Sequence, residues 1–297
     1  MTETSAPVFD RVAIVGIGLI GSSLARALRQ YGVARVVVCA DRSEAACAKA
    51  LDLGIVDEAM VDPGAAVRGA DAVILCTPVG AYAAVAETIA PHLKPGAVIS
   101  DVGSVKQAAV RDIGPVLPGG VHFVPAHPVA GTEHSGPEAG FAELFQGRWC
   151  IVTPPPGTDA AAVQRVTALW SGVGSRVEVM EPSRHDRILA ITSHLPHLIA
   201  YTIVGTAADL EEETKSAVIQ FSAGGFRDFT RIAASDPIMW RDIFLNNREA
   251  VLEILQRFTE DLTALQRAIR WGEGEVLEEH FTKTRAIRRG IIDARQA

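Results

Sequence analysis

The sequence is poor in cysteine, and its few cysteines are not closely paired. Among 297 residues there are only four, Cys39, Cys47, Cys76 and Cys150. Three of them lie inside apolar runs with the composition of strands, so buried thiols are expected, the alternative being that one of them is reactive. The pattern argues against a disulfide framework and favours a reducing cytoplasm. We also expect no metal site.

The sequence also lacks a targeting segment, a membrane span and an excess of basic charge. Residues 1–10 have neither the basic start nor the apolar stretch of a signal peptide, and no apolar run approaches the roughly 20 residues that span a bilayer. The net charge of -7 argues against a nucleic-acid partner, because phosphate binding needs a basic face. We therefore expect a cytoplasmic protein that binds neither membrane nor nucleic acid. A small anionic substrate is compatible with this charge, because it needs only a few local cations.

What the chain does contain is enough apolar residues for two folded domains. Hydrophobic residues make up 48% and charged residues 21% of the sequence, which is the balance of a globular protein rather than a disordered one. A length of 297 residues favours about two domains of roughly 150 residues each.

The first half of the chain alternates short β-branched runs with amphipathic helical patterns. The runs typical of strands are residues 11–15, 35–40, 72–76, 97–100, 121–124, 149–153 and 176–180. Such alternation, with near-continuous apolar strands, is typical of a mostly parallel sheet covered by helices on both faces. We therefore expect an α/β fold, with a Rossmann-type doubly wound sheet, over residues 1–181.

The second half has helical periodicity and no strand patterns. Apolar residues recur with a 3.6-residue period over residues 188–208, 238–269 and 275–294. Asp236 and Pro237 form a start signal for the longest of these helices, since aspartate caps free amides and proline is tolerated at the first helical position. We expect residues 182–297 to form an all-helical domain with spare apolar faces that a second subunit covers. The resemblance described below implies that this domain also binds substrate and forms a homodimer.

A glycine-rich loop follows the first expected strand. Gly16, Gly18 and Gly21 form a GxGxxG motif that leads into the helical pattern of residues 22–30. In this setting the glycines let the backbone turn tightly and approach a pyrophosphate, which rests on the helix N-terminus. The loop, which includes Leu19 and Ile20, therefore predicts a dinucleotide site rather than merely a tight turn.

The residues that follow two of the strands bear on which dinucleotide is bound. Asp41 ends the second expected strand at the position of a ribose-binding acid, where a carboxylate would repel a 2′-phosphate. This favours NAD over NADP, although the neighbouring Arg42 and Ser43 are residue types that hold a phosphate, so NADP stays an alternative. Thr77 and Pro78 end the third expected strand and are expected either near the cofactor or as a simple strand end.

Two polar segments after later strands are candidates for the chemical site. They are SDVGSVK at residues 100–106 and AHPVAGTEHSG at residues 126–136. Ligands collect beyond the carboxyl ends of parallel strands, so both segments are placed to contact a ligand. The alternative is that each segment is only a polar loop and that His127 is a structural histidine. Asp101, Gly103 and Ser104 of the first segment are further candidates for cofactor contact.

These two segments and three later ones closely resemble the prephenate dehydrogenase family. The later segments are TSHLPH at residues 192–197, GGFRDFTRIA at 224–233 and SDPIMW at 235–240. The resemblance runs through nearly the whole chain. It implies oxidation and decarboxylation of prephenate or arogenate with NAD on the route to tyrosine: hydride leaves C4 of a cyclohexadiene and the ring carboxylate departs as carbon dioxide.

The resemblance also implies roles for individual residues. His127 matches the catalytic histidine, which accepts the C4 hydroxyl proton, and Ser104 matches a serine that orients it. Arg231 is expected to clamp the ring carboxylate through its planar guanidinium, with His194 and His197 as further donors to substrate anions. Further substrate-pocket positions are Ser193, Thr132, Glu133 and Trp240, the last of which is nearly as well explained by packing.

Two other classes of protein are less consistent with these residues. A β-hydroxyacid-type dehydrogenase needs a lysine base on the first long helix of its second domain, and no lysine occurs between Glu181 and Lys215. A non-enzymatic nucleotide sensor would not need His127, Ser104 and Arg231 together. The preference between prephenate and arogenate stays open, because the two differ only in keto versus amino at the side chain. Tyrosine inhibition, if present, is expected at the active site.

Overall fold

The computed structural model describes residues 6–132, 134–209, 220 and 224–293 of the chain. Its internal contacts divide the chain into two compact units, Met1–Arg248 and Glu249–Ala297. The domain boundary expected from the sequence, between residues 181 and 182, falls inside the first unit and stays a prediction.

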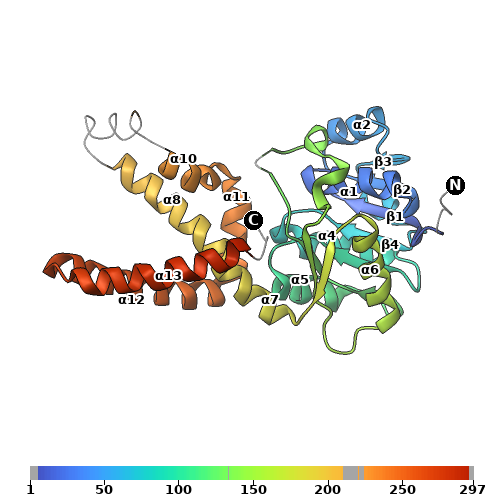
Figure 1. The fold of residues 1–297 in the computed structure, drawn as a ribbon. Coiled ribbons are helices and arrows are strands. Elements are labelled where there is room, and N and C mark those ends of the chain that lie inside the picture. Colours follow the sequence, from blue (N-terminus) through green and yellow to red (C-terminus); the bar gives the residue numbers. More distant parts are fainter. Residues whose placement is uncertain (1–5, 133, 210–219, 221–223, 294–297) are drawn as a thin grey trace. The chain divides into compact units, whose positions relative to one another are not determined.

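The first unit contains a six-stranded parallel sheet (Figure 1). In chain order its strands are β1 (Phe9–Val15), β2 (Ala34–Ala40), β3 (Glu58–Met60), β4 (Ala72–Leu75), β5 (Val98–Asp101) and β6 (His122–Phe123). They are arranged as β3-β2-β1-β4-β5-β6, which is the order of a dinucleotide-binding sheet. The expected Rossmann-type doubly wound fold is confirmed.

Helices cover both faces of this sheet, and strand β1 shows how the two faces are divided. Val12 and Ile14 point into one hydrophobic core, whereas Ala13 and Val15 point into the other, because successive side chains of a strand alternate between faces. Helices α1 (Leu19–Gln30) and α6 (Ala160–Gly172) pack in the core that contains Val12 and Ile14. Helices α4 (Tyr82–Ile89) and α5 (Lys106–Ile113) pack in the core that contains Ala13 and Val15. Two shorter helices are α2 (Glu44–Asp52) and α3 (Pro63–Ala66).

A second sheet of three strands accompanies the first. Its strands are β7 (Ala126–Pro128), β8 (Trp149–Val152) and β9 (Arg176–Val179), with β7 antiparallel and β9 parallel to β8. All seven expected strands are present, but the last two belong to this separate sheet. The short strands β3 and β7 were not predicted, because three residues are too few to show a period.

A continuous helical run follows β9. It consists of α7 (Pro182–Leu189), a π-helical turn (Ala190–His194) and α8 (Leu195–Ala208), with Pro196 in the first turn of α8. Among the described residues, Pro182–Ala208 is the one helix long and apolar enough to cross a membrane by length and composition alone. Core helices meet the same criterion, and three polar side chains of this run, those of His185, Asp186 and His194, are fully buried. The expectation of no membrane segment stays a prediction.

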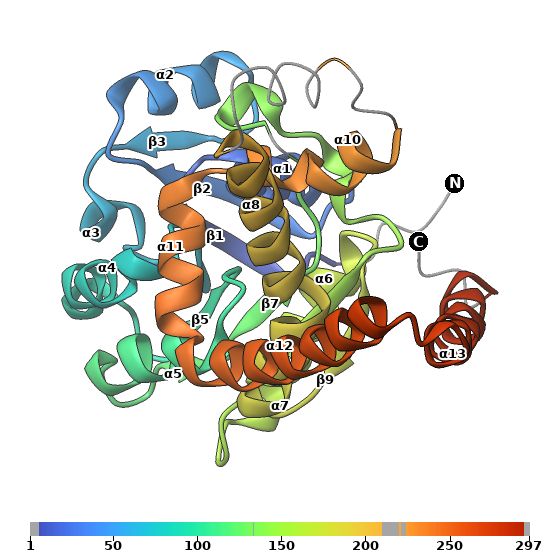
Figure 2. The same cartoon turned by 90° about the vertical axis from the view of Figure 1, so that its left-hand side faces the viewer.

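The described part of the first unit also contains the helices α10 (Gly224–Thr230) and α11 (Pro237–Asn246). Figure 2 shows α11 beside α8, where the hydroxyl of Tyr201 donates to the carbonyl of Ser235 at 2.8 Å. The expected cap of α11 is confirmed, since the Asp236 side chain accepts from the backbone N–H of Met239 at 2.7 Å.

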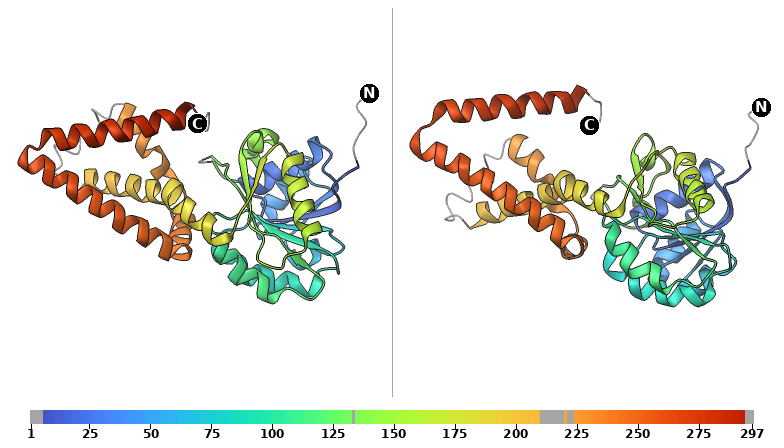
Figure 3. Two further views of the ribbon diagram at one scale, coloured as in Figure 1. Left: turned by 60° about the horizontal axis from the view of Figure 1, so that its bottom comes forward. Right: turned by 90° about the horizontal axis from the view of Figure 1, so that it is seen from below.

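The prediction of a single helix over residues 238–269 was wrong. The chain leaves the helical conformation at Asn247, the C-cap of α11, and continues as α12 (Arg248–Trp271). The 3.6-residue spacing of apolar residues continues through Asn247, so the sequence gives no sign of the break. In the second unit the chain reverses direction between α12 and α13 (Gly274–Asp293), with Gly272 in the left-handed region at φ 70° (Figure 3).

Candidate functional site

Each glycine of the loop between β1 and α1 is required for a different structural reason. Gly16 has a φ of +97°, and a Cβ there would lie 2.8 Å from the Cys76 backbone. A Cβ on Gly21 would lie 2.0 Å from the carbonyl oxygen of Gly16. A Cβ on Gly18 would meet nothing within 4 Å, and Gly18 caps α1 without a side-chain hydrogen bond. The loop therefore keeps open space at the start of a helix, as a pyrophosphate requires; Leu19 and Ile20 form the first turn of that helix.

Asp41 lies directly after β2 and faces this loop. Its carboxylate accepts the backbone N–H of Ile17 and of Ser43, both at 3.0 Å. A carboxylate has about four acceptor positions, so two remain for ribose hydroxyls. The Ser43 hydroxyl caps α2 by accepting the N–H of Ala46 at 3.2 Å, and Arg42 is exposed. Ser43 is therefore committed to the helix, whereas Arg42 is the accessible cation at this edge.

Thr77 and Pro78 lie just beyond β4 at the same edge of the sheet as the glycine loop. The hydroxyl oxygen of Thr77 is buried and has no hydrogen-bond partner among the described residues. A buried hydroxyl is normally satisfied, so this group fits a hydrogen bond to a bound cofactor. Pro78 is exposed and sets the turn into the following 3₁₀ helix.

Asp101, at the end of β5, has a different place from the expected cofactor contact. It is fully buried, and its carboxylate accepts from the Tyr82 hydroxyl at 2.8 Å and the Gly103 N–H at 2.9 Å. It also pairs with the ammonium of Lys106 and accepts the Ala126 N–H at 3.3 Å. These donors occupy the carboxylate, so Asp101 holds the loop rather than the cofactor. Gly103 supports the same loop, because a Cβ there would lie 2.3 Å from the Tyr82 hydroxyl.

His127 lies on β7, in register with Ile151 of β8, and only 8% of its surface is exposed. Burial lowers the pKa of its imidazole well below the ordinary value, and the nearby His185 and Lys106 lower it further. At neutral pH the ring is therefore neutral and able to accept a proton.

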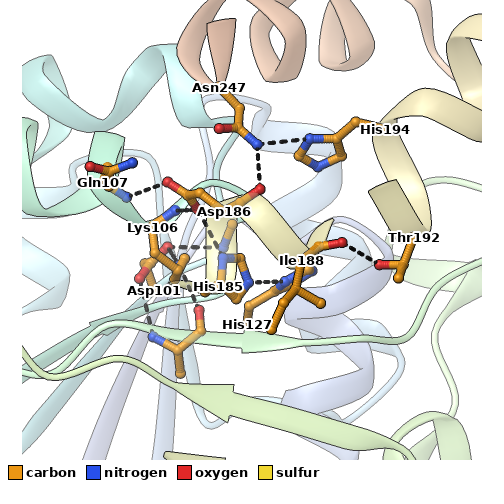
Figure 4. Close-up of polar contacts among 12 residues, drawn as sticks. Asp101, Lys106, Gln107, His127, His185, Asp186, Ile188, Thr192, His194 and Asn247 are labelled. Atoms are coloured by element: carbon orange, nitrogen blue, oxygen red, sulfur yellow. Dashed lines mark hydrogen bonds and ion pairs between the residues drawn. The ribbon is translucent and has the colours of Figure 1, made fainter. Parts of the chain in front are cut away.

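A chain of polar contacts runs from His127 to the start of helix α5 (Figure 4). Nδ1 of His127 lies 2.8 Å from Nε2 of His185, and Nδ1 of His185 lies 2.8 Å from Oδ1 of Asp186. The same carboxylate accepts the backbone N–H groups of Lys106 at 2.7 Å and Gln107 at 2.9 Å. These are the first two residues of α5, so Asp186 caps that helix.

The charge states along this chain follow from burial and hydrogen bonding. Burial raises the pKa of Asp186, but the hydrogen bonds from His185 and the two α5 amides outweigh it, and the pKa lies below its ordinary value. Burial lowers the pKa of His185, and Lys106 lowers it further, so that it lies below its ordinary value although Asp186 raises it. At neutral pH an ionised carboxylate therefore faces a neutral imidazole.

His194 is fully buried on the π-helical turn and is fixed by Asn247. The amide nitrogen of Asn247 donates to the carbonyl of Asp186 at 2.9 Å and lies 3.1 Å from Nδ1 of His194. Nδ1 of His194 therefore accepts, and the proton of the neutral ring is on Nε2. Burial lowers the pKa of His194 to about 4. Nε2 has no partner among the described residues, so it offers a buried donor.

His197, one turn along α8, lies against Trp240 of α11. The two rings stack with centroids 3.6 Å apart and planes at 23°. Nδ1 of His197 donates to the carbonyl of Ser193 at 2.9 Å. Burial lowers the pKa of His197, and the positive charge of Arg231 lowers it further. The neutral ring thus presents Nε2 as an acceptor, whereas the expected role as a donor to anions requires the protonated ring. Arg231 is exposed at the start of the 3₁₀ helix Arg231–Ala234.

The remaining expected residues are less closely tied to this cluster. Ser104 is half-buried two residues before α5; within the described part of the chain it makes no hydrogen bond to His127, which contacts His185 instead. Thr132 is exposed, and its hydroxyl accepts a backbone N–H at 3.3 Å. Glu133 lies outside the described residues.

Sequence reasoning missed the residues that fix the imidazoles, namely His185, Asp186 and Asn247. The available signal was weak, because a His-Asp pair on an amphipathic helix is common on solvated faces. Among the described residues no group of three or more histidine, cysteine or carboxylate side chains fits a metal ion. A cavity of about 430 Å³, lined by Val110, Phe123 and Pro155 among others, includes none of the expected site residues.

Comparisons with known proteins agree over nearly the whole chain. Residues 24–179 match the family described as prephenate dehydrogenase, nucleotide-binding domain, and residues 181–283 match prephenate dehydrogenase, dimerization domain. The chain is 44% identical to the cyclohexadienyl dehydrogenase of Zymomonas mobilis, over 95% of this chain and 96% of that one.

Two solved structures are similar over comparable lengths. Prephenate dehydrogenase from Aquifex aeolicus, in complex with hydroxyphenyl propionate and NAD+, has a TM-score of 0.88 and 37% identity, over 95% of this chain and 98% of that one. Arogenate dehydrogenase from Synechocystis has a TM-score of 0.80 and 28% identity, over 94% and 98%.

Proposed function

Because the chain belongs to the prephenate dehydrogenase family, we propose that it catalyses the NAD-dependent oxidative decarboxylation of prephenate, arogenate or both, a step of tyrosine biosynthesis. The observation that carries the proposal is the buried, neutral imidazole of His127 beside the nucleotide-binding sheet. A reaction in which a ring hydroxyl becomes a carbonyl needs such a base.

The chemistry assigned to His127 is proton transfer. As hydride leaves C4 of the cyclohexadiene ring, the C4 hydroxyl gives its proton to His127. The ring carboxylate then leaves as carbon dioxide, its bonding electrons complete the aromatic ring, and the oxygen at C4 regains a proton as a phenol. NAD, when bound, accepts the hydride. The proton therefore returns to the product, and His127 ends each turnover neutral.

NAD fits the residues at the carboxyl edge of the sheet. Gly18 leaves space for a pyrophosphate at the start of α1, Asp41 has acceptor positions left for ribose hydroxyls, and the Thr77 hydroxyl lacks a protein partner. A carboxylate at position 41 disfavours the 2′-phosphate of NADP, although Arg42 is exposed nearby. NAD is therefore the preferred cofactor.

Substrate anions are assigned to the helical residues of the same unit. Arg231 supplies a planar pair of donors for the ring carboxylate, and His194 supplies the buried Nε2–H. His197 and Trp240 form a stacked wall, with Ser193 tied to His197 through its carbonyl. Ser104, Thr132 and Glu133 complete the assigned set.

A homodimer in the cytoplasm completes the proposal. The match to a dimerization domain over residues 181–283 supports the dimer, as do exposed apolar side chains on α12 and α13, among them Leu262, Trp271 and Phe281. All four cysteines are free thiols, which suits a reducing compartment.

The test is turnover with each substrate and each cofactor. NADH or NADPH formation is followed with purified protein, with prephenate and with arogenate in turn. The proposal expects reduction of NAD with at least one of them, and the ratio of kcat/KM values gives the preference. A folded protein that binds NAD and turns over neither acid would contradict it.

A further inference from the structure

We infer that His185 and Asp186 are positioning residues that hold His127 in the one neutral tautomer able to act as a base. The inference rests on the proposed function, in which His127 accepts a proton. It concerns two buried residues of α7 that contact neither the glycine loop nor Arg231 in any described interaction.

Asp186 determines where the proton of His185 lies, because an ionised carboxylate can only accept hydrogen bonds. Nδ1 of His185 therefore carries a proton and donates it to Asp186 at 2.8 Å. A neutral imidazole has one N–H, so Nε2 of His185 is an acceptor. Nδ1 of His127, 2.8 Å away, must then be the donor. The lone pair of His127 is left on Nε2, the nitrogen that the substrate hydroxyl can reach.

The direction of this chain is fixed by the N-terminus of α5. The carboxylate of Asp186 accepts two backbone N–H groups there, from Lys106 and Gln107, and a helix N-terminus favours a negative charge. The opposite arrangement would need a protonated Asp186, which these contacts disfavour. The sheet domain thus sets, through three hydrogen-bonded steps, which nitrogen of His127 is basic.

Asp186 also specifies the tautomer of His194, whose proton lies on Nε2 rather than on Nδ1. The backbone carbonyl of Asp186 accepts from the Asn247 amide, which in turn donates to Nδ1 of His194. His194 therefore carries its proton on Nε2. One buried ring, that of His127, presents a proton acceptor and the other, that of His194, presents a proton donor. A substrate that both donates through a hydroxyl and accepts through an anionic oxygen meets both requirements.

The contact between His185 and His127 also matters after proton transfer. When His127 gains a proton, its Nδ1–H remains directed at the lone pair of His185, and the negative charge of Asp186 lies one ring further on. Proton transfer to Nε2 therefore leaves this hydrogen bond in place, and no group has to move. In serine proteases an aspartate holds the catalytic histidine in the same way; here a second imidazole is inserted between them.

Two substitutions at one position separate this role from simple packing. His185→Leu removes both hydrogen bonds, whereas His185→Gln keeps an amide N–H for Asp186 and an oxygen for His127. For the leucine variant we expect kcat to fall by about 100-fold, within the range of acid–base contributions. KM and the Kd for NAD should change less than about 3-fold, since neither ligand is assigned to His185. The glutamine variant should recover kcat to within about 10-fold of the wild type.

Trp170→Phe is the matched control for loss of stability. Trp170 is fully buried against Phe145, in the hydrophobic core that contains Val12 and Ile14. Among the described residues no hydrogen bond or ring contact joins it to His127, His185 or Asp186. If the leucine and tryptophan variants lose similar stability but only the leucine variant loses kcat, the positioning role is supported. Equal kcat losses in the leucine and glutamine variants, or a loss that appears in KM and NAD affinity instead, would overturn it.

A measurement on the wild-type protein keeps the inference testable if the variants do not fold. Imidazole nitrogen NMR shifts of ¹⁵N-histidine-labelled protein distinguish protonated from unprotonated ring nitrogens. We expect His127 protonated at Nδ1 and His194 protonated at Nε2. A His127 signal with the proton on Nε2 would refute the assignment. The spectrum needs no turnover, so an inactive protein with the expected tautomers would refute the proposed function alone.

Discussion

The carboxylate of Asp186 caps helix α5 from 80 residues further along the chain, accepting the backbone N–H of Lys106 at 2.7 Å. Val105, the residue at the N-cap position, provides no side-chain cap of its own. Helix α7, which carries Asp186, is therefore attached to α5 of the sheet domain by a charged cap and not by apolar contacts alone. The position of His127 and the stability of α5 thus depend on the same side chain.

Replacing Asp186 should therefore destabilise the protein strongly. Asp186→Ala leaves two helix amides and the Nδ1–H of His185 without a partner, and each unsatisfied buried donor costs about 1–3 kcal/mol. We expect the free energy of unfolding in urea to fall by roughly 3 kcal/mol or more. Asp186→Asn should lose less, because its carbonyl oxygen still caps one amide. A loss below about 0.5 kcal/mol for the alanine variant would contradict the capping role.

Stability should also fall in mild acid because several histidines are buried in the neutral form. The folded-state pKa of His194 is about 4, whereas an unfolded histidine titrates near 6.5. Between these values the unfolded chain binds a proton that the folded chain excludes, so lowering the pH from about 6.5 to about 4 favours unfolding. His194 alone contributes roughly 3 kcal/mol across this window. The lowered pKa values of His127 and His185 act in the same direction.

Thermal unfolding between neutral pH and pH of about 5 measures this effect. We expect Tm to decrease steadily over that range for the wild type and less steeply for His194→Gln, which keeps an acceptor for Asn247 but cannot be protonated. A Tm that is independent of pH in this window would show that these rings are not buried as neutral groups.

The sheet was predictable from the sequence, whereas the arrangement around His127 was not. Seven strands, the glycine loop and the Asp236 cap follow local patterns with a period or a fixed spacing. The contacts of Asp186 with α5 and of Asn247 with His194 join residues 80 and 53 positions apart, and no local pattern encodes such pairs. Asp101 was assigned to the cofactor because it ends a strand, but burial and the Lys106 pair place it in the interior.

Two glycines of the loop should respond differently to the same added methyl group. At Gly18 a Cβ meets no protein atom within 4 Å, so Gly18→Ala should change the free energy of unfolding by less than about 0.5 kcal/mol. It should still weaken NAD binding by about 10-fold or more, because the pyrophosphate approaches the backbone here. Gly21→Ala should lose both stability and NAD affinity, since its Cβ would lie 2.0 Å from the Gly16 carbonyl oxygen. Unchanged NAD affinity in Gly18→Ala, measured by calorimetry, would exclude this loop as the cofactor site.

Arg231 should govern substrate affinity more than the rate of the chemical step. Removing a charged donor to a carboxylate costs about 1.5–3 kcal/mol, so Arg231→Ala should raise KM by roughly 10- to 100-fold. Arg231→Lys should recover only part of this loss, because an ammonium lacks the planar pair of donors. Steady-state kinetics of the two variants give the comparison. A drop in kcat with KM unchanged would place Arg231 elsewhere in the mechanism.

The proposed function depends above all on His127 acting as the base of an NAD-dependent oxidative decarboxylation. The most direct measurement is single-turnover NADH formation by wild type and His127→Ala, each first shown to be folded and to bind NAD. We expect a decrease of about 100- to 10,000-fold in the rate of the chemical step, with little change in NAD affinity. An undiminished rate in His127→Ala would contradict the mechanism.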